Sequence, residues 1–137
     1  MNANAYLNFP GTCEEAFNFY AKCLNSQIVA LIRASDTPMK DHTPVDRQAK
    51  IMHARMHIGD TVLMGSDAPP NFFKQPQGFS VCLNIAEAAE AERVFAALSE
   101  GGAVEMAIQE TFWAKRFGTF TDRYGTPWMI NCEKPMG

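Results

Sequence analysis

The stretch Tyr6-Leu7-Asn8-Phe9-Pro10-Gly11-Thr12-Cys13-Glu14-Glu15-Ala16-Phe17-Asn18-Phe19-Tyr20 decides the fold of this 137-residue chain. Its first four residues form a short apolar run that Pro10-Gly11 cuts off, which predicts a strand ending in a turn. Thr12 and Glu15 then form a Thr-x-x-Glu capping box, which satisfies free amides at the start of a helix. The apolar residues that follow recur at the spacing of one helical face. A strand followed directly by an amphipathic helix is therefore the building unit of the fold.

The chain carries this unit twice. Leu7-Asn8-Phe9 reappears 76 positions later as Leu83-Asn84-Ile85, and in that register Phe19 corresponds to Phe95. The ends of the two copies are also similar, because Ile58–Met64 resembles Tyr124–Ile130. A repeated unit that cannot bury its own apolar face usually buries it against its twin. We therefore expect two like modules with a concave, ligand-accessible side.

Each copy has the order β-α-β-β-β, with helices confined to one face, which is an α+β architecture. In the first copy we expect further strands at 27–32, 51–58 and 61–64. In the second we expect strands at 79–85, 104–108, 117–122 and 128–132, with a helix reaching about Glu100. The modules span about 3–67 and 78–133 within a single domain, and a Pro-rich connector joins them.

The strand at 51–58 has two distinct faces. Alternation places Met52, Ala54, Met56 and Ile58 on one side and Ile51, His53, Arg55 and His57 on the other. Along a strand, the four-residue step from His53 to His57 spans about 13 Å, so these histidines cannot share a metal ion. Either one can serve alone as an acid, base or hydrogen-bond donor. The alternative is that this polar face is simply solvated.

Glu110 lies beside the aromatic stretch Thr111-Phe112-Trp113. Desolvation by aromatic neighbours raises the pKa of a carboxyl group and fits it for general acid or base catalysis. The alternative is an exposed Glu110 whose aromatic neighbours belong to the core.

Residues 33–49 form the one long irregular segment. It contains Pro38 and Pro44 among many polar residues. Loops of this length are uncommon in compact domains and are often lids or binding loops. A surface excursion without function is the alternative.

Composition excludes several classes of function. The net charge is −3 and basic residues are scattered, which disfavours nucleic-acid binding. The start of the chain lacks the features of a signal peptide, and no apolar run is long enough to cross a membrane. The cysteines, Cys13, Cys23, Cys82 and Cys132, are widely spaced, as free thiols of a reducing cytoplasm would be. We therefore expect a cytoplasmic protein that binds neither nucleic acid nor membrane.

The sequence has no Gly-rich dinucleotide or P-loop motif and no Gly-x-Ser-x-Gly elbow.

The chain resembles PhnB-like proteins of the glyoxalase/bleomycin-resistance superfamily, whose fold is also called the vicinal oxygen chelate fold. The resemblance covers essentially the full length. It rests on the residues 6–9, 15–20, 53–54, 63–67, 109–114 and 121–131. It implies paired βαβββ modules that form a curved mixed sheet around a cleft, with helices on the outer face, in a homodimer.

The resemblance also locates four metal-ligand positions, as metal-dependent members of the superfamily have them. They fall near Ala5, His53, Ser80 and Met129–Asn131, and only His53 is a good ligand among them. We therefore predict no metal site and no cofactor, and a divalent metal held in part by His53 stays as the alternative.

Two functions follow from this reading. The first is binding of a small, anionic or oxygen-rich molecule in a metal-free cleft, because Arg55 and the histidines favour such ligands. The residues expected to line the cleft are Asn8, His53, Arg55, His57, Trp113 and Asn131. The alternative is an enzyme of lyase, isomerase or dioxygenase type that uses His53 or Glu110 as its acid or base. A structural or partner-binding dimer with a vestigial cleft is the third hypothesis.

Overall fold

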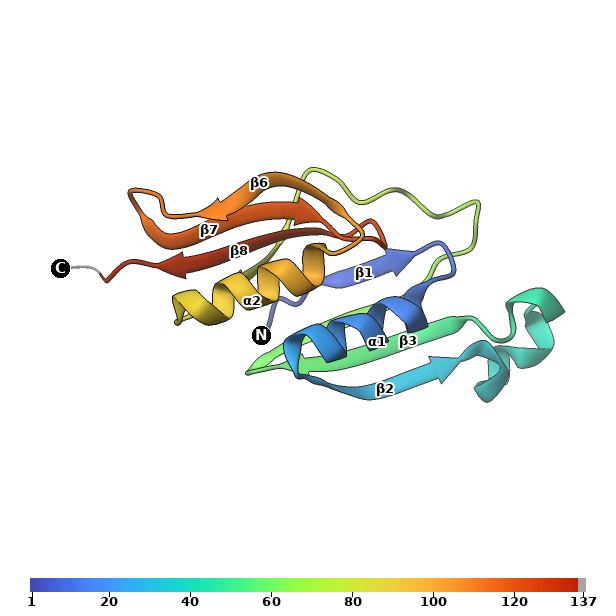
Figure 1. The fold of residues 1–137 in the computed structure, drawn as a ribbon. Helices are drawn as coiled ribbons and strands as arrows, with labels where there is room; N and C mark the ends of the chain where they lie inside the picture. Colours follow the sequence, from blue (N-terminus) through green and yellow to red (C-terminus); the bar gives the residue numbers. More distant parts are fainter. Residues whose placement is uncertain (136–137) are drawn as a thin grey trace. The chain divides into compact units, whose positions relative to one another are not determined.

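The computed structural model describes residues 1–135, and the chain divides into two compact units (Figure 1). The first unit is Met1–Lys74 and the second begins at Gln75. Each unit contains one four-stranded mixed sheet and one long helix in the order β-α-β-β-β. The α+β class and the repeated βαβββ order are thus confirmed, and the strands hydrogen-bond in two separate sheets. Neither helix in the described part of the chain is long and apolar enough to span a bilayer.

The sheet of the first unit has the strand order β1-β4-β3-β2. Its elements are β1 (Tyr6–Phe9), α1 (Cys13–Leu24), β2 (Gln27–Arg33), β3 (Ile51–Ile58) and β4 (Thr61–Asp67). The pair β1–β4 is parallel, whereas β3 runs antiparallel to both of its neighbours. Because β1 pairs with β4 rather than with β2, the chain crosses the sheet through α1, which covers one face.

The second unit repeats this topology with the order β5-β8-β7-β6. Its elements are β5 (Val81–Asn84), α2 (Ala88–Ser99), β6 (Ala103–Gln109), β7 (Ala114–Thr121) and β8 (Pro127–Glu133). The predicted strand at 117–122 therefore begins earlier, at Ala114, and the one predicted at 79–85 is shorter.

Each helix buries one apolar face on its own sheet (Figure 1). In α1 the buried side chains include Ala16, Phe17 and Tyr20, and the ring of Phe17 meets Phe9 of β1 edge-on. Beneath this contact, Gly65 leaves no room for a side chain, because a Cβ there would lie 2.9 Å from both the Leu7 carbonyl oxygen and the Phe17 ring. The close approach of helix and sheet thus depends on a glycine at this point of β4.

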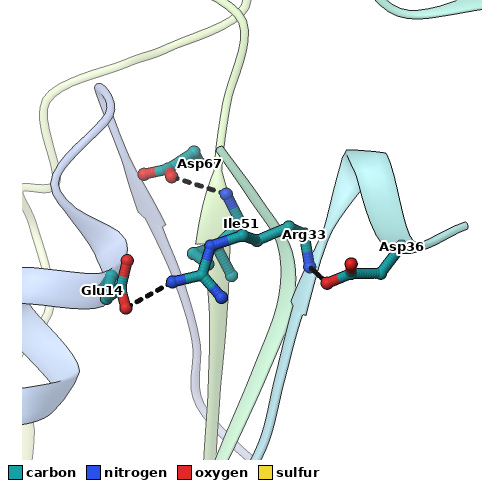
Figure 2. Close-up of polar contacts among 5 residues, drawn as sticks. All are labelled: Glu14, Arg33, Asp36, Ile51 and Asp67. Atoms are coloured by element: carbon teal, nitrogen blue, oxygen red, sulfur yellow. Dashed lines mark hydrogen bonds and ion pairs between the residues drawn. The ribbon is translucent and has the colours of Figure 1, made fainter. Parts of the chain in front are cut away.

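The start of α1 is capped by a residue distant in sequence. The predicted Thr12–Glu15 capping box is wrong, because the Thr12 side chain makes no capping hydrogen bond and its buried Oγ1 has no hydrogen-bond partner among the described residues. Asp67, at the end of β4, accepts a hydrogen bond from the Cys13 amide at 2.9 Å. It also accepts one from the Ile51 amide at 2.8 Å (Figure 2). One carboxylate therefore joins the helix, β3 and β4, and it supplies the negative charge that a helix N-terminus favours.

We expect Asp67→Ala to lower the free energy of unfolding by about 2 kcal/mol, because two backbone amides lose a charged acceptor. Chemical denaturation followed by circular dichroism measures the change. Asp46→Ala is the matched control, because Asp46 is exposed and makes no side-chain hydrogen bond among the contacts described. A loss for Asp67→Ala no larger than that of the control would contradict its role as a cap.

The face assignment in β3 needs one correction. Met52 was predicted to share a face with Ala54, yet Met52 is exposed while Ile51 and Ala54 are both buried. The cause is a bulge: the pairing passes from Ile32↔His53 to Arg33↔Ile51, so Met52 is an extra residue on β3. His53, Arg55 and His57 keep the predicted common face, which is turned away from α1.

The register of the repeat also shifts between elements. Asn8 and Asn84 are equivalent, since Asn8 pairs with Ser66 of β4 and Asn84 with Asn131 of β8. The predicted match of Phe19 with Phe95 is one residue out. Counted from the start of each helix, the buried residue of α1 at the position of Phe95 in α2 is Tyr20. Four residues separate Asn8 from the start of α1, whereas three separate Asn84 from the start of α2.

The same slip occurs at the ends of the two copies. The sequence match aligned Met64 with Ile130. In the structure Gly65 of β4 pairs with Leu7, and Ile130 of β8 pairs with Leu83, so Gly65 is the residue equivalent to Ile130.

The segment between β2 and β3 is more regular than predicted. It contains three short 3₁₀ helices: η1 (Ala34–Asp36), η2 (Pro38–His42) and η3 (Val45–Arg47). The Gln48 amide ties the segment together by donating to the carbonyls of Lys40 and Thr43. Arg33 anchors its start through an ion pair with Glu14 of α1 and a backbone hydrogen bond to Asp36 (Figure 2).

Candidate ligand-binding site

A pocket of about 480 Å³ opens in the second unit where β5 and β8 end side by side. Ligand sites in proteins commonly have volumes of this order. The residues that line it are Asn84, Ile85, Ala86, Asn131, Glu133, Lys134 and Pro135. Two amide side chains, one cation and one carboxylate thus meet in a single pocket.

The pair of asparagines results from the strand register. Asn84 lies opposite Asn131 in the parallel pair of β5 and β8, and both point away from the face that buries Ile130 and Cys132. The Asn131 Nδ2 donates to the Asn84 Oδ1 at 3.1 Å. The Asn131 Oδ1 is buried and has no hydrogen-bond partner within residues 1–135. Buried polar atoms normally have a partner, so this oxygen retains unused acceptor capacity.

Lys134 connects the pocket to Glu110 and Trp113. Its Nζ lies 3.1 Å from a Glu110 carboxylate oxygen, and its backbone amide donates to the Trp113 carbonyl at 3.4 Å. The Trp113 ring packs edge-on against Phe117, which is the β7 partner of Asn131. The structure therefore gathers the predicted residues Glu110, Trp113 and Asn131 around Lys134.

Glu110 does not sit in a desolvated aromatic environment. Its side chain is 66% exposed and forms an ion pair with Lys134, while Phe112 is 90% exposed and Trp113 45% exposed. An exposed, paired carboxylate positions a neighbouring cation more readily than it moves a proton.

Cys82 lies on the pocket side of β5, two residues before Asn84. Partial burial raises the pKa of its thiol, and the Glu133 carboxylate raises it further. A raised pKa keeps the thiol protonated, and the protonated form is a poor nucleophile.

The remaining predicted residues belong to the first unit. His53, Arg55 and His57 follow each other at alternate positions of β3, and Asn8 lies on β1. Tyr6 stacks on the His53 ring with centroids 5.9 Å apart, and its hydroxyl lies 3.4 Å from the His53 Nδ1. Tyr6 thereby orients one histidine on the sheet face that α1 leaves uncovered.

Within residues 1–135, no group of three or more His, Cys, Asp or Glu side chains is arranged to hold a metal ion. The helix start nearest to the first strand is already occupied, because the Asp67 carboxylate accepts the Cys13 amide. This is the position at which a helix N-terminus would otherwise receive the phosphate of a nucleotide-type cofactor.

Sequence reasoning found part of this site. It named Glu110, Trp113 and Asn131, and it missed Asn84 and Lys134. Asn84 could have been predicted from the sequence, because it is the repeat equivalent of Asn8, which is among the predicted cleft residues. Lys134 follows the last strand and belongs to no motif. Tyr6 could have been found only from the pairing of β1 with β4, which places β1 two strands away from β3.

Comparison with known proteins agrees with this architecture. The sequence profile of the family described as 3-demethylubiquinone-9 3-methyltransferase matches residues 2–131. The chain is 35% identical to Protein YjdN of Escherichia coli K12, over 98% of this chain and 97% of that protein.

Two solved structures are similar over almost their whole length. Protein PA1353 from Pseudomonas aeruginosa is 44% identical, with a TM-score of 0.89 over 98% of this chain and 99% of that one. A Bacillus cereus PhnB protein, described as a putative 3-demethylubiquinone-9 3-methyltransferase, is 26% identical, with a TM-score of 0.77 over 96% and 99% of the two chains.

A more distant structure shows the fold alone. The glyoxylase/bleomycin resistance protein/dioxygenase domain from Frankia sp. EAN1pec is 11% identical, with a TM-score of 0.64 over 98% of both chains. The chain therefore belongs to the PhnB-like 3-demethylubiquinone-9 3-methyltransferase family and has the fold of the glyoxalase/bleomycin-resistance superfamily.

Proposed function

We propose that the pocket between Asn84, Asn131 and Lys134 binds a small, oxygen-rich molecule that carries an anionic group. The observation that carries this proposal is the side chain of Asn131, which lines a pocket that also holds a lysine and whose Oδ1 accepts no hydrogen bond within residues 1–135. The amide oxygen of Asn131 can accept a hydrogen bond from a hydroxyl or N–H group of the ligand, and the ammonium group of Lys134 can donate to a carboxylate or phosphate oxygen. A hydroxy acid combines the two groups.

Thermal denaturation with a panel of hydroxy acids, phosphate esters and neutral polyols tests this function. A ligand at a hundred times its dissociation constant stabilises the folded state by about 2.7 kcal/mol, so binding raises the Tm by an amount that grows with the logarithm of the ligand concentration. We expect hydroxy acids to raise the Tm of the native chain. We expect Lys134→Gln and Asn131→Ala to reduce that rise.

Lys115→Gln is the matched control, because it removes one positive charge from the same unit at a residue that does not line the pocket. It should keep the full Tm rise. Equal effects of Lys115→Gln and Lys134→Gln, or stabilisation by no compound of the panel, would contradict the proposal.

A second candidate function is proton transfer by His53. The contact with Tyr6 favours it, because a general base needs a ring held in one orientation with its second nitrogen available. Exchange of a substrate C–H proton for deuterium in D₂O, followed by NMR, reports such chemistry without a known product. We expect exchange in an activated C–H compound of the panel and its loss in His53→Gln. Equal exchange in the variant would rule out His53 as the base.

We also propose a homodimer, as the family resemblance implies. In support, six of the seven residues of β6 are exposed, and Val104 and Met106 among them are apolar. Sedimentation velocity measures the mass directly, and a species of one chain at micromolar concentration would contradict the dimer.

We do not extend the methyl transfer in the family's description to this chain. The strand β1 leads into Pro10-Gly11-Thr12 rather than into a Gly-rich cofactor loop. The Asp67 carboxylate occupies the start of the helix that follows. This junction therefore lacks the Gly-rich loop that a Rossmann-type cofactor site would need.

A further inference from the structure

The first unit contains a second pocket, which plays no part in the proposed function. It has a volume of about 230 Å³ and lies where the segment 34–50 closes over the ends of β3 and β4. Its polar groups are those of Thr43, Arg47, Lys50 and Asp67, and its apolar groups include Met39, Ile51 and Met52.

The charges in this pocket are not balanced within it. Both oxygens of the Asp67 carboxylate already accept hydrogen bonds, one from the Cys13 amide and one from the Ile51 amide (Figure 2). Arg47 donates from Nη2 to the Ala68 carbonyl at 3.3 Å, and Lys50 donates from Nζ to the Gly11 carbonyl at 3.1 Å. Neither cation forms an ion pair with a carboxylate in the described part of the chain.

Backbone carbonyls hold the side chains of Arg47 and Lys50 in place, but they accept from only some of the N–H donors of these two groups. A guanidinium has five N–H donors and an ammonium three, and each of these groups uses one on a carbonyl. Two fixed cations with donors to spare are suited to an anionic oxygen, and Arg47 can bind a carboxylate or phosphate with two parallel hydrogen bonds.

The apolar side of the pocket consists of flexible side chains. Met39 is 47% exposed and Met52 41%, and Met52 is the extra residue of the β3 bulge. Unbranched methionines adapt their shape to different apolar groups. The volume equals that of only about eight waters, which is too small for a drug-sized molecule.

We propose that this pocket is a second binding site, for a small amphipathic anion. Arg47 and Lys50 bind its carboxylate or phosphate group, and Met39 and Met52 cover a short hydrocarbon tail. The bulge at Met52 serves this site, because it turns a methionine out of the core and toward the segment 34–50.

NMR of the methionine methyl groups tests this site with pentanoate as the probe. We expect saturable shifts of the Met39 and Met52 methyls, while the fully buried Met56 methyl stays in place. Pentan-1-ol has the same tail without the charge and should leave all three unchanged. Inorganic phosphate has the charge without the tail and should bind more weakly than pentanoate.

Arg47→Gln should weaken pentanoate binding about tenfold, because a charge-assisted hydrogen bond is lost. Lys40→Gln is the control, since it removes a charge from the same segment outside the pocket, and it should change the affinity by no more than about twofold. The proposal is overturned if pentanoate gives no saturable shift, if pentan-1-ol or phosphate binds as tightly as pentanoate, or if the two variants weaken binding equally. The comparison of pentanoate with pentan-1-ol needs no variant and therefore holds even if Arg47→Gln does not fold.

Discussion

Asp122→Ala is expected to lower the free energy of unfolding by about 4 kcal/mol, because it removes a charged acceptor from several buried donors at once. Asp122 is 3% exposed. Its Oδ1 accepts the amides of Tyr124 and Thr126 at 2.8 and 3.1 Å, and its Oδ2 accepts the indole N–H of Trp128 at 2.7 Å. The carboxylate thus fixes both the turn between β7 and β8 and the largest side chain of the second core.

Urea denaturation of Asp122→Ala, of Trp128→Phe and of the double variant measures this contribution. In a double-mutant cycle, we expect Asp122→Ala to cost less when the indole N–H is already absent, with a coupling energy of about 1–2 kcal/mol. Asp60→Ala is the control, because Asp60 is exposed in the turn between β3 and β4. Additive effects in the cycle would show that the contact with the indole contributes nothing.

Gly102→Ala is expected to cost about 3 kcal/mol, at the upper end of the range for overpacking. A Cβ at this position would lie 2.2 Å from the Thr121 carbonyl oxygen and 2.9 Å from backbone atoms of Asp122. Those are main-chain atoms and cannot turn aside as a flexible side chain can. The start of β6 would have to move away from the end of β7.

Gly59→Ala separates this clash from backbone strain. Gly59 has a φ of +57° and no atom within 4 Å of an added Cβ, so the variant carries strain without a clash. We expect it to cost about 1 kcal/mol, less than Gly102→Ala. Thermal and urea denaturation compare the two variants, and the reverse order of stability would contradict the close approach of Gly102 to Thr121–Asp122.

Much of the fold could be predicted from local pattern, and the errors have a common physical cause. The alternation of 51–58 predicted a strand and placed His53, Arg55 and His57 on one face. It could not predict the bulge at Met52, because a bulge depends on how β2 pairs with β3. The capping box at Thr12 was a sound local pattern, but Asp67 takes its place from 54 residues further along the chain. Contacts between segments distant in sequence decided both outcomes.

In the candidate ligand-binding site, too, local sequence patterns identified some residues, while others depend on contacts between distant segments. Asn131 and Trp113 were identifiable because they lie in a distinctive stretch, and Asn84 was identifiable by its repeat. Lys134 enters the pocket only through the geometry at the end of β8, which no motif encodes. The pocket of Arg47 and Lys50 was not predictable either, because its cations are bound by carbonyls of Ala68 and Gly11, far away in sequence.

The most direct test of the proposed function is the NMR spectrum of the asparagine side-chain amides during titration with the hydroxy-acid panel. A ligand that donates to the Asn131 Oδ1 must change the environment of the Asn131 amide and of Asn84, to which it is bonded. We predict saturable shifts of these two side-chain amides, which Lys134→Gln weakens and Lys115→Gln does not. If every compound of the panel leaves both amides unmoved at millimolar concentration, or if the shifts occur only at other residues, the pocket of Asn84, Asn131 and Lys134 is not the ligand site.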